Sequence, residues 1–123
     1  MHVLLMFGVL FSWYIRDFDV MGELSTKNKI NISEVITVDF QNERRHGIFR
    51  TIPSYFRGHP VNLKILSVRN LTNGSNTYAV KHGHRNVNIR IGDRGILVSG
   101  IQKYQNSLVC ASYTHFLYSR PLV

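Results

Sequence analysis

From Tyr14 onward, apolar and polar residues alternate with a period of two, which is the pattern of a β-strand that buries one face. The apolar positions of the first such segment are Phe18, Val20 and Leu24, and acidic residues fill positions between them. A polar stretch at residues 25–29 is typical of a turn. In the next segment, one face collects Ile30, Ile32, Ile36, Val38 and Phe40. The two segments therefore predict an antiparallel hairpin.

Shorter strand-like segments continue to about residue 104. The most regular alternation places Val87, Ile89 and Ile91 between polar residues. In residues 61–68 the alternation changes phase between Ile65 and Leu66, which predicts a β-bulge. No segment longer than a couple of turns shows the 3.6-residue period of a helix.

Short strands separated by turns predict an all-β sandwich or barrel. Of these we expect a single-domain antiparallel β-sandwich, immunoglobulin-like or jelly-roll-like, with an irregular loop at residues 41–60. The chain of 123 residues is long enough for one such core. The loop assignment depends on four residues that interrupt regular structure: Gly47, Pro53, Gly58 and Pro60.

One acid, Glu34, breaks the alternation by lying on the apolar face. Burial of an unpaired carboxylate is costly, so this side chain needs a partner. Arg50 is the natural partner because its planar guanidinium can hold a carboxylate through two hydrogen bonds. It belongs to a short motif made of His46, Gly47, Ile48, Arg50, Ile52 and Pro53. We expect the ion pair to fix this motif on the sandwich, with Gly47 supplying a backbone angle that other residues resist and Pro53 stiffening the exit.

The same motif has two other interpretations. In one, His46, Arg44, Arg45 and Arg50 line a site for an anion or a partner on an irregular loop. In the other, Glu34 and His46 perform acid–base catalysis. Catalysis has little support, because no nucleophile, metal cluster or glycine-rich phosphate loop accompanies the two residues. We therefore expect neither enzymatic activity nor a cofactor.

The net charge of +8 suggests a different class, a small basic β-barrel that binds nucleic acid. The 15 Lys and Arg residues are scattered, however, and Arg44–Arg45 is the only adjacent pair. Cys110 is the single cysteine, which excludes an intrachain disulfide and a zinc site built from thiolates. His82 and His84 have the spacing of two metal ligands on a strand, but no third ligand is near in sequence, so we expect no metal site.

Residues 1–13 form a separate, mostly apolar segment. Its apolar run is too short to span a bilayer and has the length of the apolar part of a signal peptide. A buried first strand would have the same appearance. Of the two, we favour an export signal.

Several phrases in the chain match one family in order and spacing. They are Ile15-Arg16-Asp17-Phe18-Asp19-Val20; Ile32, Glu34 and Ile36 followed by Phe40; His46, Gly47, Ile48, Arg50, Ile52 and Pro53; Ile89, Ile91 and Gly92; and Gly100 with Tyr104. Over about residues 14–104 the chain resembles the N-terminal extracytoplasmic domain of the predicted membrane proteins called domain of unknown function 2207. The resemblance implies a β-sandwich outside the cytoplasmic membrane, joined in typical members to transmembrane helices. It implies no catalytic residue, because the biochemical activity of the family is not assigned.

The chain departs from this family after Tyr104, where Gln105-Asn106-Ser107 interrupts the alternation that the family continues. We therefore expect an extracytoplasmic domain at residues 14–104, an atypical tail at 105–123, and a truncated or frameshifted member of the family. Resequencing of the locus would test this, because an uninterrupted frame that ends at Val123 contradicts it.

Together these observations predict a binding or structural module at the cell envelope. Its partner would be an unknown envelope protein or ligand, and it would reach the membrane through helices that this chain lacks. Nucleic acid is not the expected partner, and the basic nucleic-acid-binding barrel is the alternative.

Overall fold

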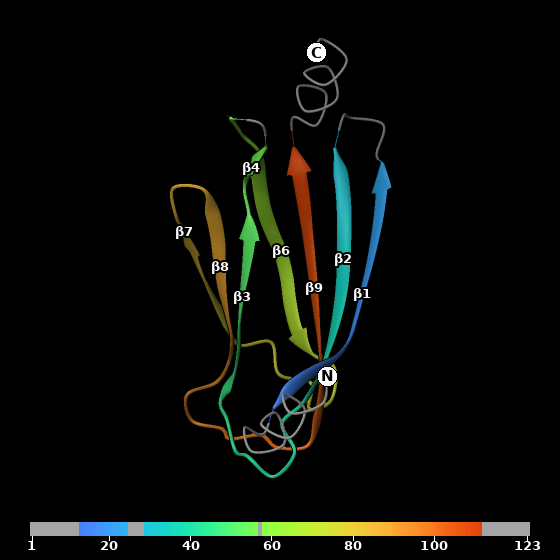
Figure 1. Cartoon of the computed structure of the whole chain (residues 1–123), viewed down its shortest axis with the longest axis vertical. Coiled ribbons are helices and arrows are strands. Elements are labelled where there is room, and N and C mark those ends of the chain that lie inside the picture. The colour runs from blue at the N-terminus through green and yellow to red at the C-terminus, as the bar shows by residue number, and fades with distance from the viewer. Residues whose placement is uncertain (1–12, 25–28, 57, 112–123) are drawn as a thin grey trace, which may run out of the picture.

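The structure is a computed structural model that describes residues 13–24, 29–56 and 58–111 (Figure 1). Within these residues the regular elements are all strands: β1 (Tyr14–Leu24), β2 (Ile30–Asp39), β3 (Gly47–Pro53), β4 (Tyr55–Phe56), β5 (His59–Pro60), β6 (Asn62–Asn70), β7 (Tyr78–His82), β8 (Asn86–Gly92) and β9 (Ile101–Ala111). The export signal predicted for residues 1–13 lies outside the described residues, apart from Trp13. The same holds for the end of the predicted tail, residues 112–123.

The predicted hairpin is present as the antiparallel pair β1 and β2. Phe18 lies opposite Ile36, and Val20 lies opposite Glu34. Since directly opposed residues point to the same side of a sheet, the apolar residues of β1 share the face that β2 turns inward.

The predicted bulge is also confirmed. The register of β6 against β9 shifts between Ile65 and Ser67, which leaves Leu66 exposed on the surface. An extra residue in one strand of a pair is the definition of a bulge, and it restores Val68 to the buried face.

The prediction of an irregular loop at residues 41–60 is wrong over residues 47–53, which form β3 and pair with β8 along their whole length. The two short strands β4 and β5 also lie in this range. The proline was misleading because β3 is the edge strand of its sheet. Proline is tolerated in an edge strand, where its missing N–H faces no neighbour.

The predicted interruption at Gln105-Asn106-Ser107 is likewise wrong. β9 continues to residue 111 and pairs with β2 on one side and β6 on the other. Asn106 does face the interior, but its amide donates a hydrogen bond to Glu34, so this inward polar residue is accommodated rather than disruptive. The domain boundary expected after Tyr104 therefore falls inside a strand.

The strands form two main antiparallel sheets, with the orders β1-β2-β9-β6 and β3-β8-β7 (Figure 1). The inward faces of both sheets supply the buried apolar core: Ile36, Val38, Phe40, Ile48, Ile52, Leu63, Val68, Val87, Ile89, Ile91, Tyr104, Leu108 and Cys110. The described strands do not close into a barrel. The prediction of an all-β antiparallel sandwich is therefore confirmed.

The two sheets differ in width, so the narrower sheet leaves part of the wider one uncovered. β6 contacts β7 and β8, whereas Arg50 of β3 reaches Glu34 of β2. The three-stranded sheet therefore covers β6, β9 and β2, and β1 extends beyond it. Consistent with this, every described residue of β1 is exposed. In the part of the chain that the structure describes, no helix has the length and apolar character needed to cross a membrane.

Candidate functional site

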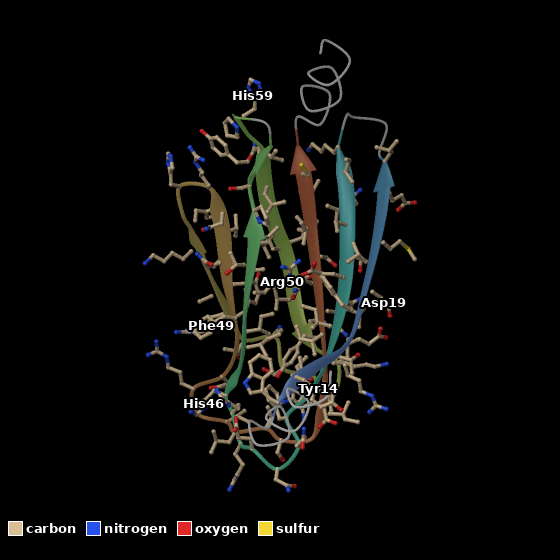
Figure 2. All side chains as sticks on the ribbon, in the orientation of Figure 1. Tyr14, Asp19, His46, Phe49, Arg50 and His59 are labelled. Atoms are coloured by element: carbon tan, nitrogen blue, oxygen red, sulfur yellow. The ribbon has the colours of Figure 1, made fainter. Side chains whose placement is uncertain are left out.

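The predicted ion pair between Glu34 and Arg50 joins the two sheets, and Figure 2 labels Arg50 on β3. Arg50 donates two hydrogen bonds to the carboxylate, from Nε to Oε1 and from Nη2 to Oε2, each 2.8 Å long. Asn106 Nδ2 donates a third, 2.9 Å long, to Oε1. The Glu34 side chain is only 3% exposed, against 25% for Arg50. The arrangement is the bidentate geometry expected from the residue types.

The pKa of Glu34 follows from competing effects. Burial of the carboxyl raises the pKa, because desolvation disfavours the charged form. The hydrogen bonds from Arg50 and Asn106 and the charge of Arg50 lower it. The lowering effects prevail, so the pKa of Glu34 lies below the ordinary value and the carboxylate stays ionised at neutral pH.

Arg50 also protects the open edge of β3. Its third nitrogen, Nη1, donates a 2.8 Å hydrogen bond to the carbonyl of Thr51. Its guanidinium lies 5.1 Å from the ring centre of Phe18 on β1, within the range of a cation–π interaction. One side chain therefore connects β1, β2 and β3. An inward-pointing charge at an edge strand is a recognised way to block pairing with another chain.

The remaining motif residues divide between the interior and the surface. Ile48 and Ile52 are buried on either side of Arg50, and Pro53 is exposed at the end of β3. His46 precedes β3 and is exposed. Its Nδ1 lies 3.0 Å from the carbonyl oxygen of Ile96 and 3.3 Å from that of Asp93. Because carbonyls only accept, Nδ1 carries a proton in this arrangement.

Gly47 has a positive φ, the kind of backbone angle predicted for it, and the structure adds a second reason for glycine at this position. It lies directly opposite Gly92 in the β3–β8 ladder. A Cβ atom on Gly47 would lie 1.8 Å from the Ile91 carbonyl oxygen, and one on Gly92 would lie 2.1 Å from the His46 carbonyl oxygen. The close approach of the two backbones therefore requires glycine here in addition to the backbone angle.

The anion site predicted from His46, Arg44, Arg45 and Arg50 is not assembled as expected. Arg50 points into the sandwich and is engaged by Glu34. Arg45 and His46 instead line a groove of about 400 Å³ near the paired ends of β3 and β8. The further lining residues include Phe49, Arg90 and Arg94, which sequence reasoning did not single out.

The alternation of residues along β3 and β8 contains enough information to place Phe49 beside Arg90. Phe49 and Arg90 are opposed in the β3–β8 ladder, and both occupy outward positions next to buried isoleucines. Recognition of residues 47–53 as a strand would have placed them together. Asn106 is not predicted as a partner of Glu34, because a polar residue in an alternating segment favours a break in the strand.

A metal site is not apparent in the described ranges, where no group of three or more His, Cys, Asp or Glu side chains is arranged to hold an ion. His82 and His84 are both exposed, at the turn between β7 and β8. The ring of His84 lies 6.1 Å from that of Tyr55, a contact between aromatic groups.

The buried hydroxyl of Tyr104 on β9 makes the stability of the fold depend on pH in the alkaline range. Its side chain is buried, and no described residue forms a hydrogen bond with its hydroxyl. Burial raises the pKa of Tyr104 to about 12. The folded state thus keeps this proton between about pH 10 and 12, where an unfolded tyrosine releases it. The contribution of Tyr104 to folding stability is therefore fully present below about pH 10 and is lost as the pH rises through this range.

We expect Tyr104→Phe to abolish this alkaline loss and to change the free energy of unfolding at pH 7 by less than about 1 kcal/mol, since an unpartnered buried hydroxyl contributes little. Thermal melting of both proteins at pH 7 and pH 11 is the measurement. A loss of 2 kcal/mol or more at pH 7, by the scale of a satisfied buried hydrogen bond, would contradict the assignment.

Comparison with known proteins gives one positive result. Searches of curated proteins and of solved structures found no match. A family model, described as the N-terminal domain of a predicted membrane protein (DUF2207), matches residues 14–112. The match extends past Tyr104 to the end of β9, in agreement with the strand observed there. The chain therefore belongs to the DUF2207 family of predicted membrane proteins, of which it contains the N-terminal domain.

Proposed function

We propose that this domain is a binding module on the extracytoplasmic side of the membrane, and that it receives an extended segment of a partner protein along β1. The observation that carries the proposal is the uncovered apolar row on the inner face of this strand. Phe18, Val20 and Leu24 are 47%, 58% and 65% exposed, although the row faces the same way as the core. Contiguous exposed apolar residues commonly mark interaction sites.

β1 is also the edge of the four-stranded sheet, and no other described strand lies beside its outer backbone groups (Figure 1). The edge strands β1 and β3 differ in the features that discourage pairing with another chain. β3 carries the protective contact of Arg50 with Thr51 and ends in Pro53, whereas the 11 residues of β1 include neither proline nor lysine. An extended segment added to β1 would complete its hydrogen bonds and cover Phe18 and Val20.

The charges of β1 indicate what kind of segment fits. Its outward positions include Asp17, Asp19 and Glu23, on the face opposite to the apolar row. A partner strand would place its own side chains beside these two rows, because opposed residues share a face. We infer a segment in which apolar residues alternate with lysine or arginine. A second copy of β1 fits poorly, since pairing would bring like charges together.

Two synthetic peptides of equal length test this specificity, one alternating valine with lysine and the other valine with glutamate. We expect the lysine peptide to bind about tenfold more tightly, because three opposed charge pairs contribute up to about 1 kcal/mol each. Perturbation of backbone NMR signals should be confined to β1 and its neighbour β2. The triple variant Asp17→Lys, Asp19→Lys, Glu23→Lys should reverse the preference.

Equal affinity for both peptides, or perturbations centred on β3, β6 or β7, would refute binding along β1. Binding of single-stranded DNA with a steep dependence on salt would instead favour the basic nucleic-acid-binding class. The acidic row of β1 opposes that class, since it would repel phosphates.

The side of the membrane is tested separately. Asn73 lies in the exposed turn between β6 and β7, so Asn73→Cys should react with a membrane-impermeant maleimide in intact cells that produce the protein. The unmodified chain is the matched control, because its single cysteine, Cys110, is buried. Labelling that occurs only after cell lysis would place the domain in the cytoplasm.

A further inference from the structure

The groove near the ends of β3 and β8 lies on a different part of the molecule from β1. Figure 2 shows Phe49 on the side of β3 away from the four-stranded sheet. Three arginines and one histidine line the groove, and no acidic residue does. Its volume of about 400 Å³ lies within the usual range of small-ligand sites.

The arginines differ in whether their charge is already compensated. Arg45 forms an ion pair with Glu43 and lies 5.9 Å from the ring centre of Trp13. Arg90 is half-buried and Arg94 is exposed, and no described residue forms an ion pair or hydrogen bond with either guanidinium. A guanidinium without an ion-pair partner keeps all its donors available for a bound anion.

We propose that this groove binds a phosphate group, with Arg90 and Arg94 as its principal ligands. Guanidinium groups match the geometry of phosphate oxygens through paired hydrogen bonds, so two uncompensated arginines in one groove suit this anion. Phe49, which is 78% exposed, supplies an apolar wall for the uncharged part of a ligand. Nδ1 of His46 is turned toward the Ile96 and Asp93 carbonyls, so Nε2 is the ring nitrogen left for a ligand.

Two sources of phosphate are consistent with a membrane-protein domain, a lipid headgroup and a soluble phosphate. Titration of the full chain with inorganic phosphate, followed by NMR, tests whether the groove binds the phosphate group that both sources contain. Co-sedimentation with phosphatidylglycerol vesicles, compared with phosphatidylcholine vesicles, tests the lipid. Binding in both experiments assigns the headgroup, and binding of inorganic phosphate alone assigns a soluble ligand.

The double variant Arg90→Gln, Arg94→Gln should weaken binding about tenfold or more, as expected for the loss of charge-assisted hydrogen bonds. The matched control is Lys64→Gln, Arg69→Gln, which removes the same charge from exposed positions of β6. It should change binding less than about twofold, by the small effect of distant screened charges. Thermal melting confirms that both variants fold.

Equal weakening by the two double variants would show that only the net charge of +8 matters, and would overturn the site. Absence of binding to both phosphate and vesicles would overturn it as well. Neither result affects the proposed role of β1, because that surface shares no residue with the groove.

Discussion

Replacement of Arg50 with methionine is expected to lower the free energy of unfolding by about 3 kcal/mol at pH 7. The variant keeps most of the side-chain volume but leaves the Glu34 carboxylate buried with only the Asn106 amide as a donor. Loss of one partner of a buried pair costs this much because the remaining charge stays desolvated. Urea denaturation gives the measurement.

The pH dependence of the stability of Arg50→Met distinguishes the loss of a charge partner from the loss of packing. In the native protein the lowered pKa of Glu34 contributes stability that is present above the ordinary glutamate pKa of about 4.3 and is lost as the pH falls below it. Without Arg50, burial dominates and raises the pKa of Glu34. The stability deficit of Arg50→Met should therefore shrink as the pH is lowered from 7 to 4.

A second substitution separates the same two causes. Glu34→Gln added to Arg50→Met removes the stranded charge and should recover part of the stability. As a matched control, Arg69→Met on the exposed face of β6 should change stability by no more than about 0.5 kcal/mol. If Arg50→Met and Arg69→Met melt alike, the ion pair does not fasten the sheets.

Gly47→Ala is expected to be at least as disruptive, with a loss of about 3 kcal/mol or failure to fold. The added methyl carbon would lie 1.8 Å from the carbonyl oxygen of Ile91, which is backbone and cannot rotate away. The β3–β8 ladder must therefore separate at its end. Circular dichroism and thermal melting of the purified variant measure the loss.

Gly22→Ala provides the comparison for Gly47→Ala. Gly22 also lies in a strand, but a Cβ atom there would make an ordinary contact, 3.9 Å from Ile30 Cγ2. Alanine should be neutral or slightly stabilising at this position, because it restricts the unfolded chain more than glycine does. A similar loss in both variants would mean that steric overlap with Ile91 is not the reason for glycine at position 47.

Prediction from sequence succeeded where one physical rule decided the outcome. The position of Glu34 on an apolar face required a cationic partner, and Arg50 was the residue whose geometry suited it. The bulge near Leu66 followed from a phase change that only an extra residue can produce. In both cases, local alternation contained the necessary information.

Prediction failed where a distant strand changed the meaning of a residue. Pro53 indicates a loop only if both sides of its segment are paired, and the sequence does not show that β3 is an edge. Asn106 indicates a break only if its amide finds no acceptor, and that acceptor is Glu34, 72 positions earlier. The groove was missed for the same reason, since Arg90 meets Phe49 only through strand pairing.

The position of β9 has a consequence for biosynthesis. This strand is the last described in the chain, yet it lies in the middle of its sheet between β2 and β6. Until the ribosome has released residues 101–111, the β1–β2 hairpin has no means of joining β6, and the sheet is split into two pieces. Pairing between segments so far apart in the chain is slow to form. We therefore expect the four-stranded sheet to assemble only after synthesis has passed β9, with the β1–β2 hairpin and β6 as separate pieces until then.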